Sequence, residues 1–304
     1  MQRLNKKFIF YITYKKVYFF SSFGYTITMS ECTHNCSTCN KGDCKDRTSL
    51  IEKPHGTTKI KKIIGVVSGK GGVGKSFISS MLAVNACKSG LKTAIMDADI
   101  LGPSIPKSFG FGENDRAVGS EEGLIPVTTK SGIKVMSINL LLEEETKPVV
   151  WRGPVISAVV KQFYTDVLWG EIDVMFIDMP PGTGDVPLTI FQSLPIDGII
   201  VVTTPQDLVK MVVEKSLNMA HMMNVPVLGI VENMSYFVCP TCNEKHYIFG
   251  QGVGKKIADE YNLKLLAEVP LDEQITEKIN SGKVEEVDVS CLNEALNTIK
   301  DFKK

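Results

Sequence analysis

Short apolar runs recur along the chain from residue 63 onward, and polar or glycine-containing stretches bound each of them. The runs do not alternate with polar residues and are rich in β-branched side chains, which is typical of strands buried on both faces of a sheet. The predicted strands cover residues 63–67, 93–96, 174–177, 198–202, 227–231 and 265–269.

Longer amphipathic stretches separate several of these runs and predict helices over residues 77–88, 155–168, 208–223 and 254–261. Strands that alternate with helices in this way form a mostly parallel sheet covered by helices on both faces. The sequence therefore predicts an α/β fold. Ligands of such sheets bind at the carboxyl ends of the strands, so the residues that follow each strand are the first candidates for a site.

Composition divides the chain into three sections. Residues 1–28 are basic and aromatic, and two lysines interrupt their apolar stretch, so neither a signal peptide nor a membrane-spanning helix is predicted there. We expect a mis-assigned start or a disordered extension, with Met29 as the true first residue, and a membrane-surface arm as the alternative. Residues 29–58 form a cysteine-rich segment with a polar linker over 46–62, and residues 59–304 form the main domain.

Acidic and basic residues balance at 34 each, which gives no indication of a nucleic-acid partner. Five of the basic residues lie in the first section, which has no acidic residue, so the rest of the chain is mildly acidic. The C-terminal stretch carries Leu292, Leu296, Ile299 and Phe302 at helical spacing, with acidic residues interspersed. We expect it to pack on the sheet rather than on a membrane. A cytoplasmic protein without stable membrane association is predicted.

A glycine-rich run links the first predicted strand to the first predicted helix. Every fixed position of the pattern G-x-x-x-x-G-K-[ST] is filled, the run being Gly69, Lys70, Gly71, Gly72, Val73, Gly74, Lys75 and Ser76. Glycines let the backbone bend around a triphosphate, so that successive N–H groups and the helix N-terminus point at its oxygens. Because both flanks also match, the run predicts a P-loop rather than a glycine-rich turn without function.

The last two residues of this run have predicted roles of their own. Lys75 supplies a positive charge to the outer phosphates, and the Ser76 hydroxyl can ligate Mg²⁺. We expect Lys75 to lie in an exposed loop, so that its replacement by alanine removes nucleotide-dependent function and leaves the fold intact.

Two acidic residues follow predicted strands. Asp178 closes the strand over 174–177 and leads into a glycine-rich turn, so it is predicted to hold the Mg²⁺ shell. Asp99, in the triplet Asp-Ala-Asp after the strand over 93–96, is predicted to orient the attacking water. Capping of the following turns is the structural alternative for both acids.

Asn233 follows the strand over 227–231 and offers an amide that can hydrogen-bond to adenine. No N-K-x-D run follows it, which disfavours guanine. The predicted nucleotide is ATP.

Eight cysteines in a chain without a predicted secretory signal favour metal or redox chemistry over disulfides. Cys239 and Cys242 form a C-x-x-C pair, and two thiolates cannot complete a four-coordinate site for a soft metal. A two-fold dimer would supply four and could hold one 4Fe-4S cluster between the chains. Zinc held by this pair, His246 and a water is the alternative, and structural or redox-active thiols are a third possibility.

Four further thiols lie in the N-terminal section, at Cys32, Cys36, Cys39 and Cys44. They meet the four-thiolate requirement of a cluster or of zinc within one segment, and their spacing does not choose between the two metals. His34 and Asp43 are interpreted as solvated loop residues. Cys87 and Cys291 stand alone in helix-like apolar stretches and are predicted to be small buried side chains.

The position of Lys70 within K-G-G-V-G-K-S resembles the deviant Walker A class of P-loop ATPases. That resemblance implies that Lys70 reaches across a two-fold interface to the nucleotide of the partner subunit, and hence that the chain forms a homodimer. A solvated lysine without this role is the alternative.

Seven stretches together resemble the Mrp/ApbC iron-sulfur cluster carrier ATPases, from about residue 60 to the C-terminus. They are GKGGVGKS, DADILGPSIP, WRGP, FIDMPPGTGD, TTPQ, VENMSYFVCPTC and IFGQG. The resemblance implies that Cys239 and Cys242 bridge a 4Fe-4S cluster at the dimer interface, and that ATP is needed to pass the cluster to apo-proteins. It also implies a separate cluster donor. The N-terminal cysteines resemble those of scaffold relatives, with tighter spacing.

Two other classes of ATPase share parts of this pattern. A MinD/ParA-like positioning ATPase with a structural zinc site shares the deviant loop, but it has no use for the C-P-x-C run. A nitrogenase-reductase-like electron donor shares a bridged dimer, but we expect its bridging cysteines to be widely separated single residues.

Overall fold

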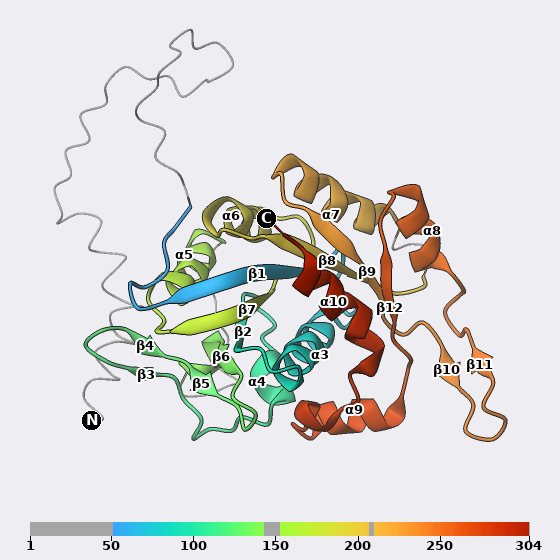
Figure 1. Cartoon of the computed structure of the whole chain (residues 1–304), viewed down its shortest axis with the longest axis horizontal. Helices are drawn as coiled ribbons and strands as arrows, with labels where there is room; N and C mark the ends of the chain where they lie inside the picture. The colour runs from blue at the N-terminus through green and yellow to red at the C-terminus, as the bar shows by residue number, and fades with distance from the viewer. Residues whose placement is uncertain (1–50, 143–152, 207–209, 304) are drawn as a thin grey trace, which may run out of the picture. The chain divides into compact units, whose positions relative to one another are not determined.

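A computed structural model of the chain describes residues 51–142, 153–206 and 210–303 (Figure 1). The chain divides into two units, residues 1–50 and 51–304, and only the second contains described residues. The predictions for residues 1–28 and for the four N-terminal cysteines therefore lie outside the described residues, as do Trp151 and Arg152.

An eight-stranded sheet forms the centre of the second unit, in the order β12-β9-β8-β1-β7-β2-β6-β5. Every neighbouring pair is parallel except β5 and β6, which are antiparallel. The bounds are β12 (Leu265–Glu268), β9 (Val227–Glu232), β8 (Gly198–Thr203), β1 (Lys59–Ser68), β7 (Glu171–Asp178), β2 (Thr93–Asp97), β6 (Lys134–Met136) and β5 (Val127–Thr128). All six predicted strands are present, and the mostly parallel α/β sheet is confirmed.

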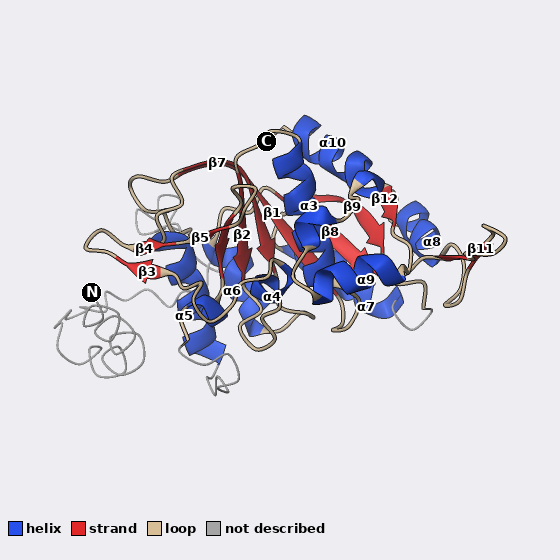
Figure 2. Cartoon of the chain, turned by 90° about the horizontal axis from the view of Figure 1, so that it is seen from below, coloured by secondary structure: helices blue, strands red, loops and turns tan. Residues whose placement is uncertain are grey.

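Helices cover both faces of the sheet, as predicted (Figures 1 and 2). One face carries α3 (Lys75–Lys88), α4 (Ile105–Ser108), α9 (Glu273–Asn280) and α10 (Asn293–Asp301), and the other carries α5 (Gly153–Thr165), α6 (Asp185–Ser193) and α7 (Lys210–Met222). The remaining helix, α8 (Val253–Glu260), packs against β9 and β12. Short two-stranded ribbons join β3 (Val118–Gly119) to β4 (Leu124–Ile125) and β10 (Phe237–Val238) to β11 (Lys245–His246).

The C-terminal helix α10 packs against α3, β9 and β12. Leu292, Leu296 and Ile299 are buried, which confirms packing on the fold rather than on a membrane. The Lys62 ammonium donates to the carbonyl of Ile299 at 2.6 Å and so satisfies an acceptor at the helix C-terminus. Among the described residues, no helix is long and apolar enough to cross a membrane.

Several boundaries differ from the sequence predictions. The strand β1 begins at Lys59, inside the predicted linker, because residues 59–62 pair with β7. The helix α5 ends at Thr165, before the predicted residue 168, because the chain then turns to pair with β4: Leu168 N donates to Leu124 O at 2.8 Å.

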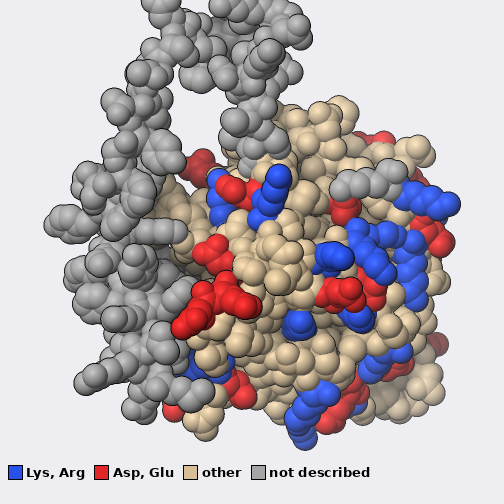
Figure 3. Space-filling model, turned by 60° about the vertical axis from the view of Figure 1, so that its left-hand side comes forward, with Lys and Arg blue, Asp and Glu red and all other residues tan. Residues whose placement is uncertain are grey.

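The two isolated cysteines are half-buried rather than fully buried. Cys87 lies on α3 and its thiol donates to the carbonyl of Ser131 at 3.2 Å. Cys291 lies in a short 3-10 helix (Ser290–Leu292), where burial raises the pKa of its thiol. Acidic and basic side chains are interspersed over the face shown in Figure 3.

Candidate nucleotide and metal sites

The glycine-rich run joins the carboxyl end of β1 to the start of α3 at the centre of the sheet. Gly72 and Gly74 have φ angles of 81° and 79°, which side-chain-bearing residues rarely adopt. The run lines a cavity of about 390 Å³. The opposite walls come from the segment after β2, which includes Asp99, and from Ile279 and Asn280 at the end of α9. This cavity lies at the strand ends, where the fold predicts a ligand.

Lys75, Ser76 and Asp178 meet at the base of this cavity. The Lys75 ammonium lies 2.7 Å from one carboxylate oxygen of Asp178, and the Ser76 hydroxyl donates to the other at 2.5 Å. Ser79, one turn along α3, also donates to Asp178 at 2.8 Å. These bonds satisfy a carboxylate that has no solvent exposure, so the predicted juxtaposition of phosphate loop and strand-end acid is present.

The expectation that Lys75 lies in an exposed loop is wrong. Its side chain is 6% exposed, because the ammonium turns inward to Asp178 and lies 3.9 Å from Asp99. Removing Lys75 would leave the Asp178 carboxylate buried without its cation, and breaking a buried pair in this way costs about 3 to 5 kcal/mol. A loss of function in a Lys75 variant therefore requires a check of folding.

Asp97 is a buried acid that the sequence interpretation missed. It pairs in register with Asp178 across β2 and β7, and it accepts hydrogen bonds from the Ser137 hydroxyl at 2.9 Å and from Asp99 N at 3.2 Å. Burial, followed by the charge of Asp178, raises the pKa of Asp97 well above its ordinary value. Burial also raises the pKa of Asp99, and the charge of Lys75 opposes that shift. Aligning the ends of the two predicted strands would have revealed this pair.

Asn233 lies beneath the phosphate loop and is 2% exposed. Its amide nitrogen donates to the carbonyl of Val73 at 2.9 Å, and a Cβ atom at Gly74 would lie only 2.2 Å from that nitrogen. The side chain is not among those that line the cavity, and its contact with adenine stays a prediction. In the structure Asn233 has a supporting role, because its hydrogen bond to the carbonyl of Val73 holds the backbone of the phosphate loop in place.

Lys70 has a partner within its own chain. Its ammonium donates to the side-chain oxygen of Gln206 at 2.8 Å, and Gln206 follows β8 in the stretch TTPQ. Both side chains are partly buried. The predicted contact of Lys70 with a partner subunit stays a prediction.

The C-x-x-C pair lies at the turn of the β10–β11 ribbon, which projects from the body of the unit (Figure 1). Cys239 N donates to Glu244 O at 2.9 Å, and Asn243, with a φ of 60°, donates back to Cys239 O at 2.8 Å. The backbone N–H groups of Cys242 and Thr241 donate to the sulfur of Cys239 and hold the pKa of that thiol below its ordinary value. The turn therefore favours a thiolate, the form that binds metals.

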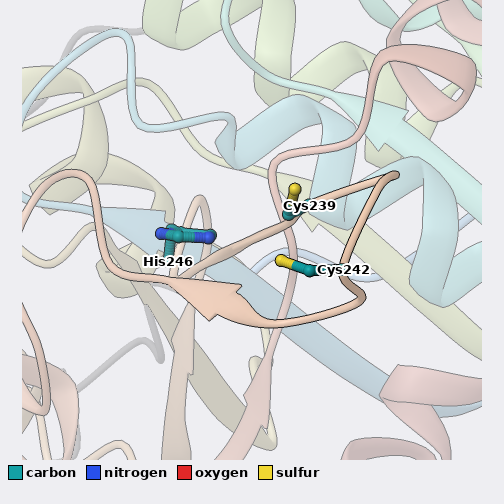
Figure 4. Close-up of side chains that lie close together, drawn as sticks. All are labelled: Cys239, Cys242 and His246. Carbon is teal, nitrogen blue, oxygen red and sulfur yellow. The ribbon is translucent and has the colours of Figure 1, made fainter.

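His246 completes a group of three metal-ligating side chains on this ribbon. One ligand atom from each of Cys239, Cys242 and His246 lies within 4.8 Å of the others (Figure 4). Figure 4 shows the imidazole pointing from the β11 strand toward the two sulfurs. Cys239 is half-exposed and the other two are exposed, so all three can reach an ion from solvent.

Glu232 anchors both ends of the segment that carries this ribbon. Its buried carboxylate accepts a hydrogen bond from Ser235 Oγ at 2.7 Å, before the ribbon, and from Gly254 N at 2.5 Å, after it. The next residue along the chain is Asn233, which supports the phosphate loop. Two adjacent residues at the end of β9 therefore contact both the phosphate loop and the segment that carries the β10–β11 ribbon.

Comparison with known proteins gives consistent matches. A family model described as NUBPL iron-transfer P-loop NTPase, of the ParA group, matches residues 59–302. An iron-sulfur cluster carrier protein of Methanocaldococcus jannaschii is 47% identical over 84% of this chain and 90% of its own length. A cytosolic Fe-S cluster assembly factor, CFD1 of Kluyveromyces lactis, is 44% identical over 76% of this chain and 84% of its own length.

A solved structure is similar as well. The nucleotide-binding protein of Archaeoglobus fulgidus, in complex with ADP, superimposes with a TM-score of 0.67 and 46% sequence identity. The match covers 75% of this chain and 88% of that one. The phosphate-loop fold expected from the sequence is thereby confirmed.

Proposed function

The chain belongs to the iron-sulfur cluster carrier family of P-loop NTPases, and from this membership and the two sites we propose that it is an ATPase that carries a 4Fe-4S cluster. A dimer of two chains would hold the cluster between them and pass it to apo-proteins. Membership in this family also disfavours the positioning ATPase and the electron donor as alternatives.

The phosphate loop supports the ATPase part of the proposal. The loop N–H groups and Lys75 would bind the phosphates, and the buried carboxylate of Asp178 with the Ser76 hydroxyl offers the oxygen ligands that Mg²⁺ prefers. A bound Mg²⁺ would neutralise charge that develops on the phosphates. Asp99 lines the cavity and lies near Lys75, where its carboxylate would orient the attacking water.

The observation that carries the cluster part is the thiol pair on the projecting ribbon, in which Cys242 is exposed and Cys239 half-exposed. Each chain presents Cys239 and Cys242 at an accessible turn, whereas a 4Fe-4S cluster takes four thiolates. Two chains related by a two-fold axis would supply four equivalent sulfurs. Because both chains would supply ligands to the shared cluster, dissociation of the dimer would release it.

We further propose that nucleotide binding influences cluster retention through the end of β9. Asn233 contacts the phosphate loop and the adjoining Glu232 contacts both flanks of the ribbon. Lys70 would leave Gln206 to reach the nucleotide of the partner subunit in the dimer. The protein would act in the cytosol, receiving its cluster from a donor protein.

Anaerobic reconstitution with iron and sulfide tests the shared cluster. The full-length chain would carry serine at Cys32, Cys36, Cys39 and Cys44, so that any cluster belongs to the ribbon. We expect about four irons per dimer, and loss of the iron and of the dimer in Cys239→Ser or Cys242→Ser. Cys87→Ser is the matched control and should change neither.

A measurement of ATP binding shows whether a ribbon variant has lost only its cluster ligands or has misfolded. The ribbon variants should bind ATP like the cluster-free parent protein, because the phosphate loop lies on another segment. A full complement of iron in a monomeric fraction, or a cluster that survives Cys239→Ser, would contradict the proposal.

A further inference from the structure

The ribbon holds more metal ligands than the shared cluster would use. A cluster between two chains takes the two sulfurs of each, and His246 then has no part in it. Yet the imidazole faces both sulfurs, and the ligand atoms of the three side chains lie within 4.8 Å of one another (Figure 4). Such spacing lets three side chains of one chain reach one ion.

The backbone hydrogen bonds of the ribbon place Cys239, Cys242 and His246 on the same face of the ribbon. Phe237 pairs with His246 in register, so Cys239, two residues after Phe237, projects on the same face as the imidazole. Two backbone hydrogen bonds, from Cys239 N to Glu244 O and from Asn243 N to Cys239 O, close the turn that brings Cys242 back beside Cys239. The base of the ribbon is also held, because the Lys245 ammonium lies 4.0 Å from the ring centre of Tyr236.

The donor set selects the class of ion. Two thiolates and one imidazole are soft and borderline ligands that suit Zn²⁺, and not Mg²⁺ or Ca²⁺, which take oxygen ligands. Three protein ligands around a tetrahedral ion leave the fourth position to water or to an incoming ligand. The exposure of the ribbon gives that position access to solvent.

We propose that a single chain of this protein binds one divalent cation of the zinc class through Cys239, Cys242 and His246, with a fourth position open to an exogenous ligand. Binding releases the thiol protons and involves no change of oxidation state. His246 distinguishes this one-chain site from a shared site built of cysteines alone.

One consequence rests on the proposed function: the ion and the shared cluster exclude each other, because both need the same two sulfurs. An ion held by one chain would keep the ribbon from bridging to a second. The monomer and the dimer would then carry different metals on the same turn.

Cobalt titration tests the one-chain site. The probe is Co²⁺, added anaerobically to the full-length chain with serine at the four N-terminal cysteines, and displaced afterwards by Zn²⁺. We expect one Co²⁺ per chain in a monomeric fraction, with the strong visible absorption of four-coordinate cobalt bound to thiolates. One Co²⁺ per two chains, bound only by a dimer, would overturn the proposal.

Substitution of the imidazole tests its role. His246→Ala and His246→Gln should each weaken Co²⁺ binding by about tenfold or more, since even loss of a supporting group costs a metal site that much. His221→Ala, an exposed histidine on α7, is the matched control and should leave the affinity unchanged. Equal affinities in the parent and both His246 variants would rule out the ligand role. Unchanged ATP binding would show that the variants are folded.

Cluster reconstitution in His246→Ala keeps this proposal separate from the proposed function. We expect the variant to assemble the shared cluster as the parent does. Co²⁺ binding without any cluster in either protein would refute the cluster proposal alone. Cluster in both proteins, with no loss of Co²⁺ affinity in the variant, would refute the one-chain site alone.

Discussion

Asp97 and Asp178 face each other at the ends of neighbouring parallel strands, with Lys75 as the cation beside them. The raised pKa of Asp97 determines whether its contribution to stability grows or falls as the pH rises. A carboxyl with a raised pKa in the folded state stabilises the protein fully below the ordinary pKa of aspartate, and that contribution is lost as the pH rises through the raised value. Burial therefore makes the ionised form of Asp97 unfavourable in the folded state.

Asp97→Asn should therefore increase the free energy of unfolding relative to the parent protein as the pH rises above the ordinary pKa of aspartate, because the amide cannot ionise. The gain should shrink toward zero near about pH 4, the ordinary pKa of aspartate. Urea unfolding near that pH and at neutral pH measures it. Glu121→Gln, at an exposed position outside any helix, is the control and should show neither effect. A gain of equal size at both pH values would show that charge is not the cause.

Gly72 and Gly74 offer a matched pair of substitutions in the phosphate loop. Both have φ near +80°, so alanine at either costs about 1 to 2 kcal/mol of backbone strain. Only at Gly74 does the added Cβ meet Asn233, and overpacking adds about 1 to 3 kcal/mol. Gly74→Ala should thus lose more stability and more nucleotide affinity than Gly72→Ala, measured by urea unfolding and equilibrium titration.

A second change tests whether the contact causes the difference. Gly74→Ala combined with Asn233→Ala should recover part of the loss relative to the sum of the single variants, because the clash is gone. Strict additivity would mean that Asn233 does not confine the loop.

At the scale of elements, α9 contributes a wall of the nucleotide cavity through Ile279 and Asn280. The Asp272 carboxylate caps this helix, accepting from Gln274 N at 2.7 Å and from Ile275 N at 3.1 Å. None of the helix residues is buried, so the cap has little packing to support it.

Asp272→Ala should lower the free energy of unfolding by about 1 kcal/mol, as loss of an N-cap does. It should also weaken ATP binding, because the frayed helix no longer closes the cavity. Asp288→Ala removes a similar bond, to Ser290 N at 2.9 Å, away from the cavity. That control should lose similar stability and keep its affinity, as urea unfolding and nucleotide titration would report. Equal affinities in the two variants would contradict the role of α9.

The sequence allowed prediction of elements whose pattern is strong and local. The sheet strands form unbroken apolar runs, and the phosphate loop is a fixed pattern of residues. By contrast, α6 carries a proline in its first turn, α9 has no buried residue, and β6 is only three residues long. None of these elements therefore shows a clear periodicity of hydrophobic residues in the sequence. The burial of Lys75 and Asp97 depends on strands far apart in the chain, and His246 faces the sulfurs only because of the ribbon register.

At the scale of the whole molecule, a ligand that binds only the folded unit stabilises it by mass action. Mg-ATP at about 100 times its dissociation constant should add about 2.7 kcal/mol and raise the melting temperature by about 5 to 10 °C for a unit of this size. Thermal unfolding with and without nucleotide measures the shift. A shift of the same size with an equal concentration of Mg²⁺ and phosphate alone would contradict specific nucleotide binding.

The position of β1 at the centre of the sheet also sets the order of events during synthesis. Its two neighbours, β7 and β8, come from residues 171–178 and 198–203, far beyond the phosphate loop. A ribosome adds about 5 to 20 residues per second, so a gap of about 100 residues leaves β1 unpaired for about 5 to 20 s. During that interval both edges of this apolar strand lack their hydrogen-bonding partners. We expect folding to be more productive when this strand is shielded until its partners emerge.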